Sequence, residues 1–364
     1  MINKLYHLLF KHIDSFLMTC LFFALLLSLF VLYSASGQDI TRVYAQTVNI
    51  GVALSVLWLI TNVSPQNLER VARPLYVLGL VLLVGVALFG HISHGARRWL
   101  DIGPMHIQPS EIMRLAVPMM IAWYFASREG KPNTSDFMVG GVILAVPVAL
   151  IMKQPDLGTS LLIASSGFYV LFLAGLSWRF LLGSALTVLA MTPIFWSLLH
   201  DYQRKRIEIL LDPTQDPLGA GYHTIQAIIA IGSGGFAGKG WLNGTQTQLD
   251  FLPERTTDFI FAVFSEEFGF LGNLLLLALF SLIIMRGLVI ASQAQSTFSR
   301  LLAGSITLNF FSYAFVNMGM VSGILPVVGV PLPLISYGVT SMVTLALSFG
   351  ILMSIHSHKK LVAT

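Results

Sequence analysis

The chain has 364 residues, of which 55% are hydrophobic and 10% are charged, and its formal net charge is +4. Soluble domains carry about 25% charged residues, so a water-soluble fold is excluded. Helices that cross a bilayer need on the order of 20 apolar residues, because hydrocarbon offers no partner to backbone polar groups. We therefore expect an all-α integral membrane protein. No compact basic block indicates nucleic acid, and the single cysteine, Cys20, excludes an internal disulfide and a thiolate metal cluster.

Ten apolar segments, separated by glycine, proline and charged residues, are expected to span the membrane. The first is too long for the apolar region of a signal peptide and lacks a convincing cleavage site, so we expect it to be retained. In chain order the expected spans are 15–36, 43–63, 75–91, 111–127, 137–152, 158–175, 180–199, 268–291, 301–321 and 336–356. Residues 1–364 then form one domain, in which 200–257 is a large outer loop between the seventh and eighth spans.

The distribution of lysine and arginine predicts the orientation, because short cytoplasmic segments are enriched in both. An even number of spans places both termini on one side. If that side is cytoplasmic, the inner segments hold Lys4, Lys11, Arg70, Arg73, Arg128, Lys131, Arg179, Arg286, Arg300, Lys359 and Lys360. The short outer loops hold only Arg42, Arg97, Arg98 and Lys153. We therefore expect both termini in the cytoplasm and the large loop outside.

Three outer segments are rich in polar groups. In the first, residues 91–114, Glu111 and Arg114 lie one helical turn apart, just inside the fourth span. Ionisable groups at that depth are costly unless they are paired or functional. An ion pair that only holds the helix end and a functional pair are about equally favoured. Arg97 and Arg98, taken alone, would be solvated loop charges.

The second outer segment is a tight turn, from Lys153 to Ser160, in which Asp156 is better explained as the N-cap of the next helix than as a catalytic group. The third is the long loop, which is predicted to contain an interfacial helix at Tyr222–Ile231. The Gly-rich turn after it ends near Lys239 and lacks the P-loop pattern, so a nucleotide site is not indicated.

Asp258 closes the long loop, directly before the apolar residues Phe259, Ile260 and Phe261. A carboxylate at the start of an apolar helix is partly desolvated, which raises its pKa and makes it a better proton acceptor. By composition alone, a helix N-cap and a general base are equally favoured. Glu266 and Glu267, two turns later, are expected to anchor the helix at the membrane interface.

The segment 319–338 is apolar but interrupted by three prolines and several glycines. It is too broken for a straight helix and too apolar for a free loop. We expect a re-entrant or interface-hugging segment that is buried by protein.

These motifs resemble the SEDS family (shape, elongation, division and sporulation) over nearly the whole chain, and its elongation branch more than its division branch. The resemblance rests on several long motifs in the same order: GARRWLDIG, QPSE, QPDLGTS, DPLGAGYHTIQ, FLPERTTDFIFAVFSEEFG and GMVSGILPVVGVPLPLISYG. Two positions depart from the family pattern: Thr256, where His is usual, and Val339, where the family has a second Gly after Ser-Tyr-Gly. Arg114 stands where the family commonly has Lys.

The resemblance implies a GT-C-like bundle of ten spans and a peptidoglycan glycosyltransferase that polymerises lipid II at the periplasmic face of the bacterial inner membrane during elongation. It implies that Asp258 is the essential aspartate and the general base of an inverting transfer. The residues then expected to contact the substrate all lie at the level of the outer membrane surface: Arg98, Glu111, Arg114, Lys153, Asp156 and Lys239.

The expected partners are lipid II, an undecaprenyl-diphosphate-linked glycan, a class B penicillin-binding protein transpeptidase and the elongation complex. A divalent cation, Mg²⁺ or Mn²⁺, would suit a diphosphate leaving group, although no ligand cluster with diagnostic spacing locates one. The alternative is a lipid II flippase, but its binding site would place ionisable groups or broken helices near the bilayer midplane. A non-catalytic scaffold is disfavoured by the polar outer segments.

Overall fold

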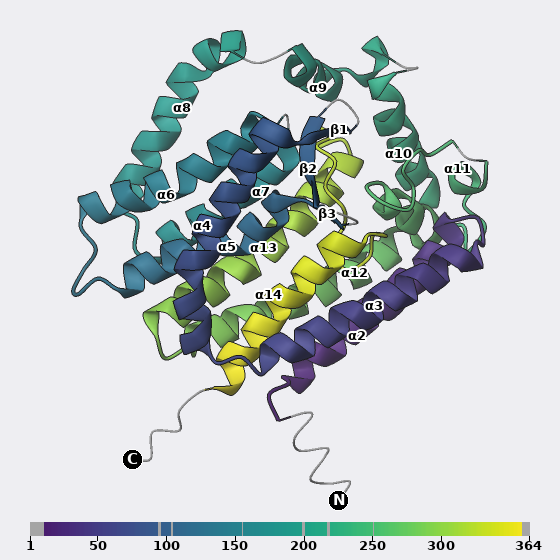
Figure 1. The fold of residues 1–364 in the computed structure, drawn as a ribbon. Coiled ribbons are helices and arrows are strands. Elements are labelled where there is room, and N and C mark those ends of the chain that lie inside the picture. Colours follow the sequence, from purple (N-terminus) through teal and green to yellow (C-terminus); the bar gives the residue numbers. More distant parts are fainter. Residues whose placement is uncertain are drawn as a thin grey trace, which may run out of the picture.

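The computed structural model describes residues 11–358 except 94–95, 103–104, 155, 199–200, 217–218 and 250; the side chains of 91–98, of 101–107 and of some residues within 184–220 are not described. The described chain is mainly helical (Figure 1). Its elements are α2 (Ser15–Ala35), α3 (Ile40–Thr61), α4 (Pro65–Phe89), β1 (His91–Ser93), β2 (Ala96–Ile102), β3 (Met105–Ile107), α5 (Pro109–Ala126), α6 (Thr134–Met152), α7 (Leu157–Leu173), α8 (Trp178–Leu198), α9 (Asp201–Leu211), the 3₁₀ turn η1 (Pro213–Gln215), α10 (Ala220–Gly234), α11 (Thr245–Gln248), α12 (Ile260–Ser292), α13 (Thr297–Val321) and α14 (Val339–Ser357).

The ten expected spans coincide with ten helices. Seven helices of the described chain are long and apolar enough to cross a membrane: α2, α3, α4, α6, α12, α13 and α14. The other three expected spans are occupied by α5, α7 and α8. The prediction of a multi-pass helical protein is confirmed.

Two helices begin eight or more residues before the expected span. α4 begins at Pro65 rather than 75, with the proline in the first turn, where its missing N–H costs no intrahelical bond. α12 begins at Ile260 rather than 268 and contains a kink at Gly269, whose φ is +63°. In both cases the expected span began after a charged residue, Arg73 or Glu267, that the structure places inside the helix.

Glu266 and Glu267 are enclosed by protein, and their predicted position at the membrane interface stays a prediction. Both are buried, with exposed fractions of 0% and 1%. The backbone of the Gly-rich turn packs against this part of α12, since Lys239 N donates to Glu266 O and Gly240 N to Glu267 O, both at 3.0 Å. A Cβ on Gly238 would lie 2.1 Å from Glu267 O. The glycines of this turn therefore allow close backbone packing.

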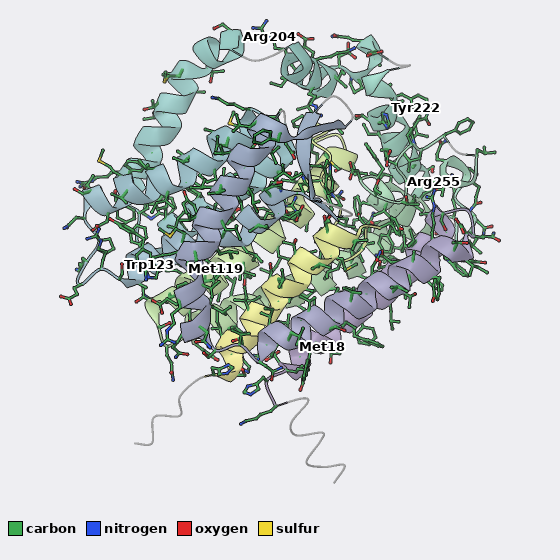
Figure 2. The ribbon with its side chains drawn as sticks, in the orientation of Figure 1. Met18, Met119, Trp123, Arg204, Tyr222 and Arg255 are labelled. Carbon is green, nitrogen blue, oxygen red and sulfur yellow. The ribbon has the colours of Figure 1, made fainter. Side chains whose placement is uncertain are left out.

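α13 is the most buried of the candidate spans and packs against α5, α7 and α12. Large apolar side chains on the outer helices are exposed, for example Phe22, Val81 and Leu275, as contact with lipid requires. α8 lies apart from the packed helices in Figure 1, and α9 and α10 lie at one end of the bundle. Figure 2 shows Arg204 and Tyr222 at that end and Met18 at the opposite end.

The beginning of α2 and the end of α14 meet at the end of the bundle opposite α9 and α10. Asp14 Oδ2 lies 3.2 Å from His356 Nε2. Arg286 Nε in α12 donates to both Asp14 oxygens at 3.1 Å. The first and last spans thus share one face, as an even number of spans requires. Which side of the membrane this face occupies stays a prediction.

A small antiparallel sheet, with the order β1-β2-β3, lies before α5. β2 pairs with β1 through His91 and Trp99, and with β3 through Leu100 and Ile107. These strands were not predicted, because they are short and carry charged residues rather than a regular alternation.

The segment 322–338, between α13 and α14, contains no helix or strand. Residues 332–336 within it are buried. Four of its residues, Gly323, Gly329, Leu334 and Gly338, have positive φ. The prediction of a broken segment is confirmed, and burial by protein is confirmed for residues 332–336 but not for 322–329. Its depth in the membrane stays a prediction.

Candidate functional site

Asp258 is not the N-cap of α12. Phe259 occupies that position, and the first turn has no side-chain cap. The partly buried Asp258 carboxylate makes no hydrogen bond or ion pair with any other residue that the structure describes. Of the two readings that the sequence left open, the geometry therefore disfavours the cap and leaves an oxygen pair available to a ligand.

The surroundings of Asp258 favour its protonated form. Burial, with a smaller contribution from the nearby Glu254 carboxylate, raises the pKa of Asp258 to about 6. The backbone of Gly329 lies beside the Asp258 carboxylate: a Cβ added to Gly329 would lie 3.4 Å from Asp258 Oδ2. A carboxylate with a pKa close to the working pH can accept a proton and still be ionised at neutrality.

Three hydrogen bonds hold the turn containing Asp258 against α13 and the 322–338 segment. Asn317 Nδ2 donates to the backbone oxygen of Asp258 at 2.8 Å. Ser336 Oγ donates to Thr257 O at 2.7 Å, and Tyr337 N donates to Thr256 O at 2.9 Å. The position of Asp258 is thus set by residues about 60 to 80 positions away in the chain.

The sequence analysis did not single out Asn317, although an amide inside an apolar span is an available signal. Thr256, a departure from the family pattern, is buried and is held here through its backbone oxygen.

Glu111 and Arg114 form a buried ion pair at the start of α5. Arg114 Nη1 lies 2.8 Å from Glu111 Oε2, which also accepts from Thr344 Oγ1 at 2.9 Å. The Arg114 guanidinium stacks 5.1 Å from the ring centre of Tyr313. Asp156 caps α7 by accepting from Thr159 N at 3.2 Å, which confirms the N-cap predicted from the sequence. The structure thus brings Glu111 and Arg114 together in a neutralised, mostly enclosed cluster.

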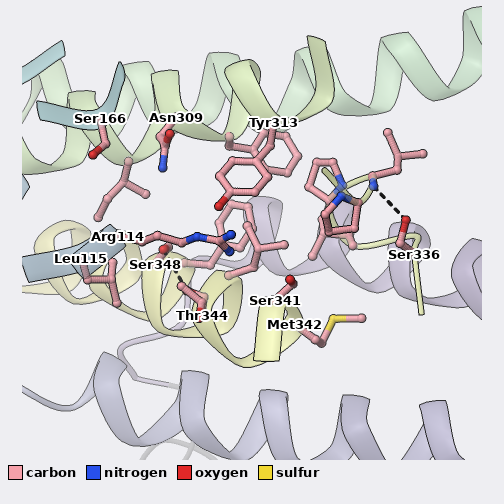
Figure 3. A pocket seen from close by; sticks show the side chains of 18 of the residues that line it. Arg114, Leu115, Ser166, Asn309, Tyr313, Ser336, Ser341, Met342, Thr344 and Ser348 are labelled. Carbon is pink, nitrogen blue, oxygen red and sulfur yellow. Dashed lines mark hydrogen bonds between the residues drawn. The ribbon is translucent and has the colours of Figure 1, made fainter. Parts of the chain in front are cut away.

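A cavity of about 40 Å³ adjoins this cluster (Figure 3). Figure 3 shows Tyr313 pointing from α13 towards Arg114 across it. Arg114 Nε, Tyr313 Oη and Asn309 Oδ1 are buried there without a hydrogen-bond partner among the described residues. The walls are mainly apolar, but these three polar atoms would give partners to water, and a space of this size can hold a few water molecules. Asp258 does not line it.

A second and larger cavity, of about 200 Å³, lies between α9, α10 and the 322–338 segment. Its polar walls are Arg206, His223 and Thr224. The His223 ring stacks on Phe259, with ring centres 5.7 Å apart, so this cavity adjoins the residue after Asp258. Neither Arg206 nor His223 is among the substrate contacts expected from the sequence.

The remaining predicted substrate contacts are dispersed. Lys239 Nζ lies 2.8 Å from the buried Glu266, which also accepts from Thr245 Oγ1 at 3.1 Å. This pairing favours a structural role for Lys239, in place of the predicted contact with substrate. Lys153 is an exposed residue at the C-cap of α6. Arg98 lies in β2, and its side chain is outside the described part of the structure.

Among the residues that the structure describes, no group of three or more His, Cys, Asp or Glu side chains is placed to hold a metal ion. The site is therefore described in terms of the chain's own side chains. The predicted divalent cation stays a prediction.

The fold and motifs match those of known proteins. The sequence family described as "Cell cycle protein", which comprises FtsW, RodA and SpoVE, matches residues 7–361. The chain belongs to this family. Its relatives include the peptidoglycan glycosyltransferase MrdB of Escherichia coli K12, 52% identical over 97% of this chain and 95% of the relative. The MrdB of Helicobacter pylori 26695 is 38% identical over 84% and 81% of the two chains.

Solved structures of family members have the same fold. One comes from a study of how a peptidoglycan synthase complex coordinates polymerisation and crosslinking. It has a TM-score of 0.81 and 31% identity, covering 94% of this chain and 97% of that one. Another is the rod shape determining protein RodA of Thermus thermophilus, with a TM-score of 0.71 and 28% identity, covering 94% and 96%. The predicted membrane fold of the FtsW/RodA/SpoVE family is thereby confirmed.

Proposed function

We propose that this family member is a peptidoglycan glycosyltransferase, which polymerises lipid II into glycan strands at the periplasmic face of the inner membrane. The names of the relatives, at 52% identity over nearly the full length, support the reaction class. The Asp258 carboxylate supports the mechanism, because it is partly buried, lacks a partner among described residues and has its pKa raised to about 6.

In the proposed reaction, Asp258 accepts the proton of the acceptor sugar's 4-hydroxyl while that oxygen attacks the anomeric carbon of the donor. The bond from the anomeric carbon to the lipid diphosphate breaks, and the diphosphate leaves with the electron pair. A single displacement inverts the anomeric centre. Stabilising the charge on the leaving group is usually the largest contribution to such a step.

The cation that we propose for that leaving group is Arg206, because of its place in the cavity beside the Asp258 turn. Arg114 and Lys239 are each paired with a carboxylate within hydrogen-bonding distance. Arg206 lines the cavity next to the Asp258 turn, together with His223 and Thr224. We assign the diphosphate to this cavity, and the Glu111–Arg114 pair to holding α5 and α14 in place beside the site.

We further propose that the enzyme works with a class B penicillin-binding protein in the elongation complex, with both termini in the cytoplasm. A solved relative from a peptidoglycan synthase complex supports the first point. The asymmetry of lysine and arginine supports the second.

The test is polymerisation of purified lipid II in detergent by the wild type and by Asp258→Asn. We expect polymer from the wild type and at least a hundredfold less from the variant, because a general base contributes about 10²–10⁴-fold. Asp39→Asn is the matched control: it alters an exposed N-cap carboxylate of α3 to another good cap. A folded Asp258→Asn protein with wild-type turnover would refute the assignment. Detergent also separates polymerisation from flipping, which requires a sealed membrane.

A further inference from the structure

Asn317 joins three parts of the chain through one amide group. It lies in α13 with an exposed fraction of 0%. Its Nδ2 donates to Asp258 O at 2.8 Å and to Val330 O at 2.6 Å. One side chain therefore links α13, the turn before α12 and the 322–338 segment.

The bond to Val330 determines where the wall beside the Asp258 carboxylate lies. Gly329, directly before Val330, has φ +72°. A Cβ added to Gly329 would lie 3.4 Å from Asp258 Oδ2, so the Gly329 backbone lies next to the carboxylate. The bond to Asp258 O holds the other side of the same contact. Asn317 thus holds both the backbone of Asp258 and the backbone that lies next to its carboxylate.

The chemistry of the contact requires an amide. Two buried carbonyl oxygens each accept a hydrogen bond, and the –NH₂ group of Asn offers two donors. A hydroxyl offers one donor and an ionised carboxylate none. Asn317 Oδ1 has no partner among the described residues, so the donors are the part of this side chain that is used.

The neighbouring contacts do not replace it. Ser336 and Tyr337 bond to Thr257 and Thr256, one and two residues before Asp258. Without Asn317 these bonds would keep the 322–338 segment docked, while Asp258 and Val330 would be free to separate.

We infer that Asn317 is a positioning residue of the transfer reaction, which holds the backbones of Asp258 and Val330 together so that the base keeps its place and its partly water-excluded surroundings. The inference rests on the proposed role of Asp258.

The test compares full-length wild type with Asn317→Ala and with Asn317→Asp, which keeps the side-chain volume. Ser305→Ala is the matched control, because Ser305 is also a fully buried residue of α13 and donates to a backbone oxygen, Ser166 O, at 2.7 Å. Lipid II polymerisation is measured across pH, and hydrogen–deuterium exchange is measured over 322–338.

For both Asn317 variants we expect kcat at neutral pH to fall about tenfold or more with little change in KM, because misplacing a reacting group by about 1 Å can cost about 10²-fold. In Asn317→Ala, solvation of Asp258 should move the acidic limb of the kcat/KM profile to lower pH, whereas in Asn317→Asp the added carboxylate raises the Asp258 pKa and should move the limb to higher pH. Exchange over 322–338 should become faster, and Ser305→Ala should change neither the limb nor this exchange.

A wild-type acidic limb and wild-type exchange in folded Asn317→Asp or Asn317→Ala protein would overturn the inference. If Asn317→Ala does not fold, Asn317→Asp decides the question. If neither folds, Asn317 is a folding residue and the inference also fails. If instead Asp258→Asn remains active, the proposed base is wrong, while the exchange result still reports whether Asn317 holds the segment.

Discussion

Acid should switch off turnover well above the pH at which an ordinary aspartate is protonated. The Asp258 pKa is raised to about 6 by burial and by Glu254. A general base works only when ionised. With a pKa of about 6, about 97% of the carboxylate is ionised at about pH 7.5 and about 9% at about pH 5. The expected fall in kcat/KM, which reports the ionisation of the free enzyme, is therefore about tenfold. An aspartate of ordinary pKa, near 4, would remain about 90% ionised at about pH 5.

The assay is the rate of lipid II polymerisation by the purified protein in detergent, at substrate concentrations well below KM, from about pH 5 to about pH 8. Protein kept at about pH 5 and returned to neutrality must recover its activity, which separates titration from acid unfolding. A kcat/KM that changes less than twofold over this range would refute the reasoning, because it would mean that no group with a pKa of about 6 in the free enzyme controls the step.

Replacing Glu254 provides an internal check on the cause of the shift. The Glu254 carboxylate is the smaller of the two contributions that raise the Asp258 pKa. Glu254→Gln removes its negative charge, so the acidic limb should move to lower pH while kcat at neutrality is retained. Asp39→Asn, which alters a carboxylate that caps α3, should leave the limb where it is. A limb at higher pH in Glu254→Gln would contradict the electrostatic explanation.

Three further predictions concern stability. Asp258→Asn should stabilise the fold above about pH 6 by up to about 3 kcal/mol, because a raised folded-state pKa favours folding only at low pH; thermal unfolding of both proteins across pH checks this. Arg114→Ala should destabilise by about 3–5 kcal/mol, because it leaves Glu111 buried without its cation; unfolding in detergent measures it. Lys239→Met should lower thermal stability but leave the KM for lipid II unchanged, because Lys239 is committed to Glu266.

Each of these has its own control. Asp258→Asn and wild type should be equally stable below about pH 4, where both side chains are neutral. Arg128→Ala breaks the half-exposed pair with Asp136, so it should cost only about 1 kcal/mol or less. A raised KM with unchanged stability in Lys239→Met would restore the substrate contact predicted from the sequence.

The sequence by itself determined the class and the spans. Each span is a local run of apolar residues, and lipid contact requires only such a run, so ten helices were located from hydropathy. The predicted helix boundaries were wrong where residues distant in the sequence stabilise the end of a helix. α12 extends back to Ile260 because Glu266 and Glu267 find partners in the Gly-rich turn, and no count of apolar residues reveals those partners.

The sequence also identified Asp258 as a candidate site residue, but it could not determine whether the carboxylate caps a helix or is available to a ligand. That depended on the dihedral angles at Phe259 and on what lies opposite the carboxylate. The answer comes from Gly329 and Asn317, which lie 59 to 71 positions further along the chain. Likewise, Lys239 was expected to be an available cation until the structure placed the Glu266 carboxylate beside it. The Glu111–Arg114 pair was expected from its spacing, but only the structure shows that it is enclosed. The hydrophobicity of a span can be summed along the sequence, whereas the partners of hydrogen bonds and charges depend on the folded geometry. Only the tertiary structure could therefore distinguish the proposed base from the residues that hold it.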